Sequence, residues 1–241
     1  MADEIQFQKY GTRGFGYHWE QISRSIRKRN IYVMARYGLV LDLIGNKIKD
    51  RKILDAGCGD GVLSYFLAKR GANVTGIDNS EEAIKFARER CKDSKNLDFL
   101  VASVYKLPFK DKNFDFIVSP EVIEHLEYPE KMLSEIKRVW NSKGKIIITT
   151  PIKLTEKPLD KMHYQEFFED EFEEVLKKYF DEIKIIKSHP LFWVEFQNKI
   201  ILRRNVPKYF LNLLNFLFWF NPFKNTQGWR YYTLQTAIIE K

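Results

Sequence analysis

Apolar residues near the N-terminus recur at steps of three and four residues, which is the spacing of one face of an α-helix. The pattern covers residues 18 to 44 and is interrupted near Asn30. It predicts two consecutive helices, whose buried faces carry Trp19, Ile22, Ile26, Val33, Tyr37 and Leu41.

The rest of the chain alternates between short apolar runs and longer amphipathic segments. Short runs bounded by Gly, Pro or polar residues are typical of strands, and three- and four-residue spacing is typical of helices. Strands separated by helices form a parallel sheet with helices on both faces, which is an α/β fold. The predicted strands are 53–56, 73–78, 97–101, 114–119, 145–150, 183–187 and 233–239, and the predicted helices are 62–70, 81–91, 129–140 and 165–179.

Glycines crowd the turn that follows the first predicted strand. Gly57, Gly59 and Gly61 precede a predicted helix, and the next strand ends on Asp78. Glycine lets the backbone bend sharply and lets a ligand approach without meeting a Cβ atom. A right-handed βαβ crossover brings both strand ends to the sheet edge where open α/β sheets bind ligands. We therefore expect the Asp78 carboxylate to face the glycine turn and to accept hydrogen bonds from two ribose hydroxyls.

The glycine turn departs from the two common phosphate-binding patterns. Val62 stands where a G-x-G-x-x-G fingerprint would place its third glycine. No Lys-Ser/Thr pair follows the turn to hold phosphates. A nucleoside without phosphates therefore fits this turn better than a dinucleotide.

The residues LDAGCGDG and GID resemble the first motif and the acidic second-strand end of class I S-adenosylmethionine-dependent methyltransferases. The resemblance is close over residues 50 to 150. It implies S-adenosylmethionine as cofactor and a Rossmann-like, seven-stranded, mostly parallel sheet with an antiparallel last strand. The length suits a single domain, residues 1–241. Within it, the resemblance implies a helical lid at 1–47, a cofactor-binding core at 48–188, an apolar insertion at 189–230 and the last strand at 231–241.

The resemblance also implies cofactor contacts for the first two strand ends. Gly57, Gly59 and Gly61 would admit the methionine and ribose portions. Asp55 would support the loop or the amino group. The last two contacts implied are Asp78 on the ribose hydroxyls and Asn79 beside the adenine.

Two further positions qualify the cofactor assignment. Cys58 lies inside the cofactor-binding turn, where its thiol is expected to pack rather than to react. Ser103 departs from the family, which usually carries an acid there to accept from the adenine amino group. A serine hydroxyl still accepts a hydrogen bond, and the backbone N–H of Val104 or Tyr105 could meet a ring nitrogen.

The stretch SPEVIEHLEYPEKML resembles small-molecule methyltransferases that include the ubiquinone-pathway O-methyltransferases. A sulfonium methyl is already activated, so the protein must align the acceptor and exclude water, and a hydroxyl acceptor also needs a base. Glu121 is assigned to the cofactor site, His125 is the first candidate base and His163 the second. The alternative for His125 is a structural histidine at the start of a helix, hydrogen-bonded to the backbone. The alternative for His163 is a histidine in a surface loop. The stretch lacks the N/D/S-P-P-aromatic motif of enzymes that methylate exocyclic or amide nitrogens.

The N-terminal helices precede the core, where this family often carries a lid over the cofactor. Tyr17, His18 and Trp19 are candidates to close over the site. Arg36 is a candidate partner for the methionine carboxylate, because its planar guanidinium can bind carboxylates through two parallel hydrogen bonds. The alternatives are that Trp19 only anchors its helix and that Arg36 is solvated.

Composition narrows the class of protein. Hydrophobic residues make up 44% and charged residues 30%, which is ordinary for a folded globular chain. Cys58 and Cys91 are the two cysteines, so the sequence predicts neither a disulfide framework nor a paired-cysteine zinc site, and we predict no metal ligands. The first twenty residues lack an apolar core of signal-peptide length, and we expect a cytoplasmic protein.

The charge balance favours anionic partners. The chain has 40 Lys and Arg against 32 Asp and Glu, a formal net charge of +8. Such a charge suits RNA or a lipid surface, and it also serves solubility. The basic cluster RSIRKRN at 24–30 is not interleaved with repeated stacking aromatics, which makes nucleic acid the less favoured partner.

The segment PKYFLNLLNFLFWFNPF at 207–223 is too apolar for an ordinary loop and too short to span a bilayer. Lys208, Asn212 and Asn215 fall on one narrow polar side at helical spacing. A helix lying in a membrane interface, flanked by Arg203, Arg204 and Lys224, is one interpretation. Packing on the core and a homodimer contact are the others.

These patterns predict a methyltransferase that acts on a small or lipid-like acceptor, with oxygen as the favoured acceptor atom and carbon or amine acceptors left open. The alternatives are an RNA methyltransferase that uses its basic surface and a cofactor-binding subunit without turnover. We expect a cytoplasmic location, with peripheral membrane contact if 207–223 meets lipid.

Overall fold

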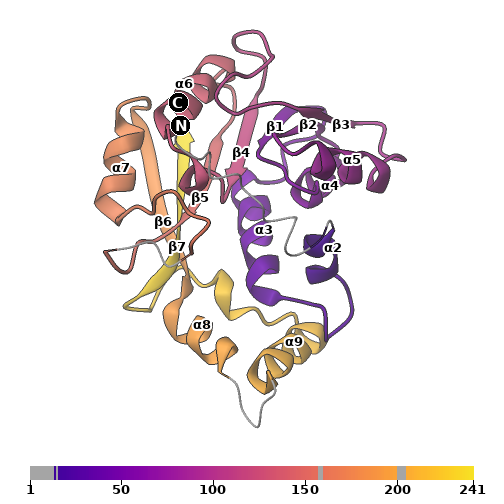
Figure 1. Cartoon of the computed structure of the whole chain (residues 1–241), viewed down its shortest axis with the longest axis vertical. Helices are drawn as coiled ribbons and strands as arrows, with labels where there is room; N and C mark the ends of the chain where they lie inside the picture. The colour runs from indigo at the N-terminus through magenta and orange to yellow at the C-terminus, as the bar shows by residue number, and fades with distance from the viewer. Residues whose placement is uncertain (1–13, 15, 157–159, 200–204) are drawn as a thin grey trace, which may run out of the picture.

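The computed structural model describes residues 14, 16–156, 160–199 and 205–241. Its centre is a seven-stranded sheet in the order β3-β2-β1-β4-β5-β7-β6 (Figure 1). The first five strands pair in parallel, and β7 runs antiparallel to both β5 and β6. The strands are β1 (Lys52–Ala56), β2 (Asn73–Asp78), β3 (Leu97–Val101), β4 (Phe116–Pro120), β5 (Ile146–Pro151), β6 (Glu182–Pro190) and β7 (Tyr232–Glu240). The predicted Rossmann-like fold with an antiparallel last strand is confirmed.

Helices cover both faces of the sheet. One apolar cluster joins the sheet to α6 (Pro129–Val139) and α7 (Glu169–Lys177), and the other joins it to α3 (Ile31–Ile44) and α4 (Val62–Lys69). The helix α5 (Glu81–Arg90) begins at Ser80, whose hydroxyl accepts a hydrogen bond from the backbone N–H of Ala83. These crossovers bring the ends of β1, β2 and β4 to one edge of the sheet.

One predicted helix begins later than expected. The predicted helix 165–179 is α7, which starts at Glu169. The backbone N–H groups of Tyr164 and Gln165 both donate to the carbonyl of Glu124, and Phe167 forms a bridge with Ile152. This pairing holds the chain extended before α7, a long-range effect that helical spacing does not reveal.

The N-terminal helices are confirmed in number but not in length. The first, α2 (Tyr17–Gln21), is short, and residues 22–29 run through turns. The N–H of Asn30 donates to the carbonyl of Gln21, which folds this stretch back on itself. The second helix, α3, begins after Asn30, whose side chain accepts from the N–H of Tyr32 at 3.1 Å.

Two helices lie between β6 and β7, at the opposite end of the molecule from α6 (Figure 1). They are α8 (Leu191–Asn198) and α9 (Val206–Phe218), and a 3₁₀ turn, η2 (Pro222–Lys224), follows them. The predicted flanking residues Arg203 and Arg204 lie outside the described residues. No helix among residues 16–156, 160–199 and 205–241 has the length and apolar character needed to cross a bilayer. The proposed boundaries of the lid, core and insertion remain predictions.

Candidate active site

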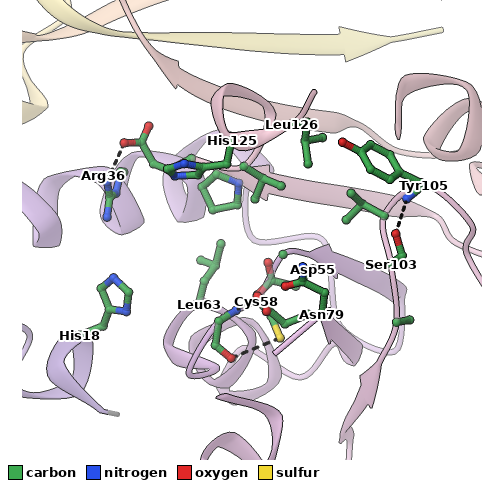
Figure 2. A pocket seen from close by; sticks show the side chains of 18 of the residues that line it. His18, Arg36, Asp55, Cys58, Leu63, Asn79, Ser103, Tyr105, His125 and Leu126 are labelled. Atoms are coloured by element: carbon green, nitrogen blue, oxygen red, sulfur yellow. Dashed lines mark hydrogen bonds and ion pairs between the residues drawn. The ribbon is translucent and has the colours of Figure 1, made fainter. Parts of the chain in front are cut away.

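A cavity opens at the edge of the sheet where β1, β2 and β4 end, and we call it the first cavity (Figure 2). It is formed by the glycine turn, the segments after β2, β3 and β4, and side chains from α2 and α3. In Figure 2, Arg36 and His125 lie on one side of the cavity, and Asp55, Cys58 and Asn79 lie on the other. Its predicted cofactor residues are Arg36, Asp55, Gly57, Cys58, Gly59, Asp78, Asn79, Ser103, Val104 and Glu121.

The glycine turn needs its glycines for two different reasons. Gly57 has a φ of 81°, and a Cβ there would lie 2.3 Å from Cγ2 of Val122. Gly57 and Gly59 line the first cavity. Gly61 caps α4 and would collide with Phe99 if it carried a Cβ, and it is not among the residues that line the cavity. The structure therefore gives Gly61 a packing role under the turn.

Asp78 faces the glycine turn, as the βαβ connection predicts. One of its carboxylate oxygens accepts from the N–H of Gly59 at 2.9 Å, and the other accepts from the N–H of Ser80 at 2.9 Å. The carboxylate therefore fixes the turn in addition to lining the cavity. Asn79, the next residue, lines the same cavity and is exposed.

Asp55 is fully buried beneath the turn. Its Oδ2 accepts from the hydroxyl of Ser64 at 2.6 Å, while Oδ1 has no hydrogen-bond partner among the described residues. Burial raises the pKa of the Asp55 carboxyl to about 7, and the hydrogen bond from Ser64 opposes this rise. A cationic group of a ligand would stabilise the charged form of this carboxylate.

Cys58, Ser103 and Val104 also line the first cavity. Burial raises the pKa of the Cys58 thiol well above its usual value, so the thiol stays protonated and its proton points to the carbonyl of Gly59 at 3.7 Å. The hydroxyl of Ser103 accepts from the N–H of Tyr105 at 3.2 Å, which stabilises the turn after β3. Ser103 and Val104 lie together on one wall of the cavity.

Arg36 and Glu121 form a buried ion pair at 2.7 Å. Burial, the largest single effect, would lower the pKa of Arg36, but the Glu121 carboxylate and the neighbouring tyrosine hydroxyls together outweigh it and raise the pKa. The other Glu121 oxygen accepts from the hydroxyl of Thr149 at 3.3 Å. Arg36 Nε has no hydrogen-bond partner among the described residues, so the guanidinium retains donor capacity.

The N-terminal helix α2 is docked on the glycine turn through Asp60. The ring nitrogen Nδ1 of His18 lies 3.1 Å from Oδ1 of Asp60, and the indole N–H of Trp19 donates to the Asp60 carbonyl at 2.8 Å. His18 lines the first cavity, whereas Trp19 anchors the helix. Tyr17 lines a neighbouring cavity.

That neighbouring space, which we call the second cavity, shares His18, Arg36, Glu121 and His125 with the first. His125 Nδ1 lies 2.8 Å from the carbonyl of Met162. A carbonyl only accepts, so Nδ1 carries the proton and Nε2 is a proton acceptor. The ring of His163 lies 5.0 Å from that of His125, and its Nδ1 lies 2.6 Å from a carboxylate oxygen of Glu166. The two candidate bases are therefore neighbours, and of the two only His125 reaches the first cavity.

Glu124, His125 and His163 also form a cluster of potential metal ligands. One ligand atom from each lies within 4.8 Å of the others. Glu124 accepts from the hydroxyl of Thr150 at 3.2 Å. Carboxylate and imidazole groups are common ligands of divalent ions, so this donor set has the chemistry to hold one.

Sequence reasoning missed Asp60, Glu166 and the Arg36–Glu121 pair. Asp60 stands in the glycine turn but binds a helix 42 residues away in sequence. Glu121 lies 85 residues from Arg36 and adopts a φ of 57°, which is unusual for a side chain other than glycine. The HYQE spacing of His163 and Glu166 is the one local signal that could have indicated their contact.

Comparisons with known proteins agree with this architecture. Residues 54–148 match the model of the family described as "Methyltransferase domain". The chain is 28% identical over 151 residues to a ubiquinone biosynthesis O-methyltransferase of Nitrosomonas europaea, a match that covers 62% of this chain and 63% of that protein. The chain thus matches less than two thirds of that relative's length.

Solved structures share the fold at low sequence identity. A TehB-like SAM-dependent methyltransferase from Corynebacterium glutamicum superposes with a TM-score of 0.61 and 20% identity, covering 98% of this chain and 97% of that one. Phosphoethanolamine N-methyltransferase 2 of Haemonchus contortus, solved with S-adenosyl-L-methionine, gives a TM-score of 0.67 and 19% identity over 99% of this chain and 60% of that one. The glycine turn, the sheet order and the match over residues 54–148 together support a class I S-adenosylmethionine-dependent methyltransferase.

Proposed function

We propose that the protein transfers the methyl group of S-adenosylmethionine to a hydroxyl oxygen of a small or lipid-like acceptor. The observation that carries this proposal is the position of His125, which lines both cavities. The first cavity suits the methyl donor, and the second is a separate space for an acceptor. A proton acceptor at their junction is where a hydroxyl would be activated.

The residues of the first cavity fit the cofactor. The unpartnered Oδ1 of buried Asp55 suits the ammonium group of the methionine portion, and the remaining donors of Arg36 suit its carboxylate. Each carboxylate oxygen of Asp78 can accept more than one hydrogen bond, which suits ribose hydroxyls. Asn79, Ser103 and Val104 lie beyond Asp78, where the adenine would follow.

The bound cofactor supplies an already activated methyl group, and the chain's residues supply position and proton transfer. His125 takes the hydroxyl proton at Nε2, because the carbonyl of Met162 holds its Nδ1 proton. The Glu166 carboxylate lies 2.6 Å from Nδ1 of His163 and orients its ring, so His163 is the second candidate base. The docked α2 helix covers the site through Asp60, which helps to exclude water.

The second cavity disfavours RNA as the acceptor. It is lined by the carboxylates of Glu121, Glu124, Asp160 and Glu166 and by the cations Arg36 and Lys161, and because Arg36 already pairs with Glu121, acidic groups remain in excess. A polyanionic chain entering a cavity with this many acidic groups would meet electrostatic repulsion. A neutral phenol or alcohol does not carry that penalty.

Incubation with labelled methyl donor and separated pools of lipids, small molecules and RNA tests this function. The expected result is label in an oxygen-bearing molecule of the lipid or small-molecule pool. Label found only in RNA would overturn the acceptor class. Tight S-adenosylmethionine binding with no transfer to any pool would instead indicate a subunit without turnover.

A further inference from the structure

A broad group of apolar side chains faces solvent at the α8–α9 end of the molecule, and we call it the aromatic face. Large exposed apolar residues are ordinary when scattered, but a contiguous patch marks an interaction surface. These residues come from α8, from α9 and from residues 219–220 and 229–231, which lie between α9 and β7. They are Phe192, Val206, Tyr209, Phe210, Leu213, Phe216, Leu217, Phe218, Trp219, Phe220, Trp229 and Tyr231.

Helix α9 buries a narrow side that carries Pro207, Leu211, Asn212 and Asn215, and it exposes a broader apolar side. The side-chain amide of Asn212 is fully buried and donates to the carbonyls of Ile26 and Arg29. Asn215 is also buried and donates to the carbonyl of Phe220. In a helix that packs only on its own protein the apolar side faces inward. Asn212 instead fixes α9 to the N-terminal segment, so the broad apolar side of the helix is left for a partner.

The end of α9 presents an aromatic tip. Trp219 ends the helix with a φ of 57°, and 85% of its surface is exposed. Aromatic rings of α8 and of the segment before β7 stack on one another, including Phe192 on Trp229 with centroids 5.6 Å apart. Trp and Tyr are enriched where a membrane meets water, because their rings are apolar and their N–H or O–H groups are polar.

The charges around the aromatic face have one dominant sign. Between residues 191 and 231 the sequence has one acidic residue, Glu195. Exposed Arg24 and Arg27 lie in the N-terminal segment that Asn212 holds against α9. The basic residues within the described part of 191–231 are Lys199, Lys208, Lys224 and Arg230, of which Lys224 pairs with Asp42. This charge complements an anionic surface, whereas a symmetric contact with a second copy would bring like charges together.

We propose that the aromatic face binds the headgroup region of an anionic lipid bilayer. The apolar side of α9 and the Trp219 tip insert between the headgroups, and the surrounding cations contact acidic lipids. Asn212 keeps α9 attached to the N-terminal segment, and Asn215 stabilises the turn that follows the helix, while the opposite side of α9 faces the lipid.

This surface also adjoins the second cavity. Leu191 and Val194 of α8 line that cavity, while Phe192 of the same helix is exposed on the aromatic face. A lipid-like acceptor in the bilayer would therefore have a short path to the cavity. This consequence rests on the proposed function, whereas bilayer binding itself does not.

Flotation of the full chain with phosphatidylcholine vesicles, with and without phosphatidylglycerol, tests the proposal. We expect co-flotation with the anionic vesicles that weakens as salt is raised. The double variant Leu213→Glu and Leu217→Glu should lower the bound fraction at least ~10-fold, because it places two carboxylates among the headgroups. The matched control Lys92→Gln and Lys95→Gln makes the same change in net charge at exposed positions after α5, and it should bind nearly as well.

Three outcomes would overturn the proposal. The first is that the unmodified chain fails to float with anionic vesicles. The second is that the control loses as much binding as the Glu variant, which would reduce the effect to net charge. The third is a concentration-dependent dimer that the Glu variant abolishes in light scattering, which would make a second copy the occupant. Calorimetric titration with S-adenosylmethionine should give unchanged affinity in the Glu variant, so this test is separate from that of the proposed function.

Discussion

The sheet edge around the glycine turn and the α8–α9 end use their polar residues in opposite ways. At the sheet edge, polar groups such as Asp55, Asp78 and Arg36 surround a cavity, and apolar residues pack beneath them. At the α8–α9 end, Asn212 and Asn215 are buried and aromatic rings are outside. The buried amides are hydrogen-bonded to carbonyls, which offsets the cost of burying them, whereas a large exposed apolar patch marks an interaction surface. The first region is built to hold a polar ligand, and the second is built to meet an apolar partner.

The largest effect is expected at His125, where a substitution should lower the rate of methyl transfer and leave cofactor binding intact. His125→Ala should lower the single-turnover methylation rate by ~10²- to 10⁴-fold, because a general base contributes that much to the chemical step. Cofactor affinity should hardly change. His125→Asn is the matched variant, since its amide can still donate to the Met162 carbonyl but has no basic nitrogen. Wild-type turnover in both variants would remove His125 as the base and leave His163→Ala to be tested.

The second effect concerns the buried carboxylate of Asp55. Its pKa in the folded protein is about 7, raised from 3.8, so the charged form is disfavoured by folding. Without cofactor, stability should therefore fall as pH rises from about 4 to about 7. Asp55→Asn should then raise the free energy of unfolding at pH 8 by about 1 to 4 kcal/mol, with no gain at pH 4. Urea unfolding of the cofactor-free protein at both pH values measures this.

Asp115→Asn is a control of opposite sign for the Asp55 experiment. Burial would raise the pKa of the Asp115 carboxyl. Hydrogen bonds from Asn141 and the N–H of Lys52, with nearby positive charges, instead lower this pKa overall. Asp115 therefore stabilises the fold above its unfolded pKa, and that contribution disappears as pH falls through the folded pKa. Asp115→Asn should destabilise at pH 8. Equal behaviour of the two variants would contradict the distinct environments assigned to these carboxylates.

A smaller effect, on cofactor affinity, is expected at Asp78, the last residue of β2. Asp78→Ala should weaken S-adenosylmethionine binding by about 1.5 to 3 kcal/mol, because it removes a charged acceptor from the cavity. Part of that loss would come from the glycine turn, since the N–H of Gly59 also loses its partner. Asp78→Asn keeps one acceptor oxygen and should bind with intermediate affinity. Unchanged affinity in a folded Asp78→Ala protein would place Asp78 outside the ligand site.

The smallest effect is expected on the aromatic face. Leu217→Glu should change the free energy of unfolding by no more than ~0.5 kcal/mol, because the side chain is exposed and its removal leaves no cavity. Leu211, on the buried side of the same helix, is the comparison, and Leu211→Ala should cost about 2 to 5 kcal/mol. Chemical denaturation of both variants measures the difference. A large loss for Leu217→Glu would mean that this side of α9 packs on the protein.

The sequence predicted the elements whose conformation depends on residues close together in the chain. The strands β2 and β3 match their predicted residues, and the turn between β1 and α4 follows from its glycines. Asp78 faces that turn because one crossover connects the two strands. The motif-rich segment 54–148 is also the part that matches the family model.

Contacts between distant segments could not be predicted in the same way. Nothing near Arg36 in the sequence indicates that Glu121 will pair with it, and nothing near His18 indicates Asp60. The amphipathic spacing of α9 predicted a helix, but spacing alone does not say which side faces the protein. That choice was settled by carbonyls of Ile26 and Arg29, which accept from Asn212. The order of strands in the sheet likewise depends on packing across the whole core.

Calorimetric titration of the full chain with S-adenosylmethionine tests the central claim most directly. A nucleoside cavity at the glycine turn predicts saturable binding at one site, competed by S-adenosylhomocysteine and weakened in both Asp55→Asn and Asp78→Ala. The absence of saturable heat from the folded protein, or binding that neither substitution weakens, would contradict the assignment of the first cavity to the methyl donor.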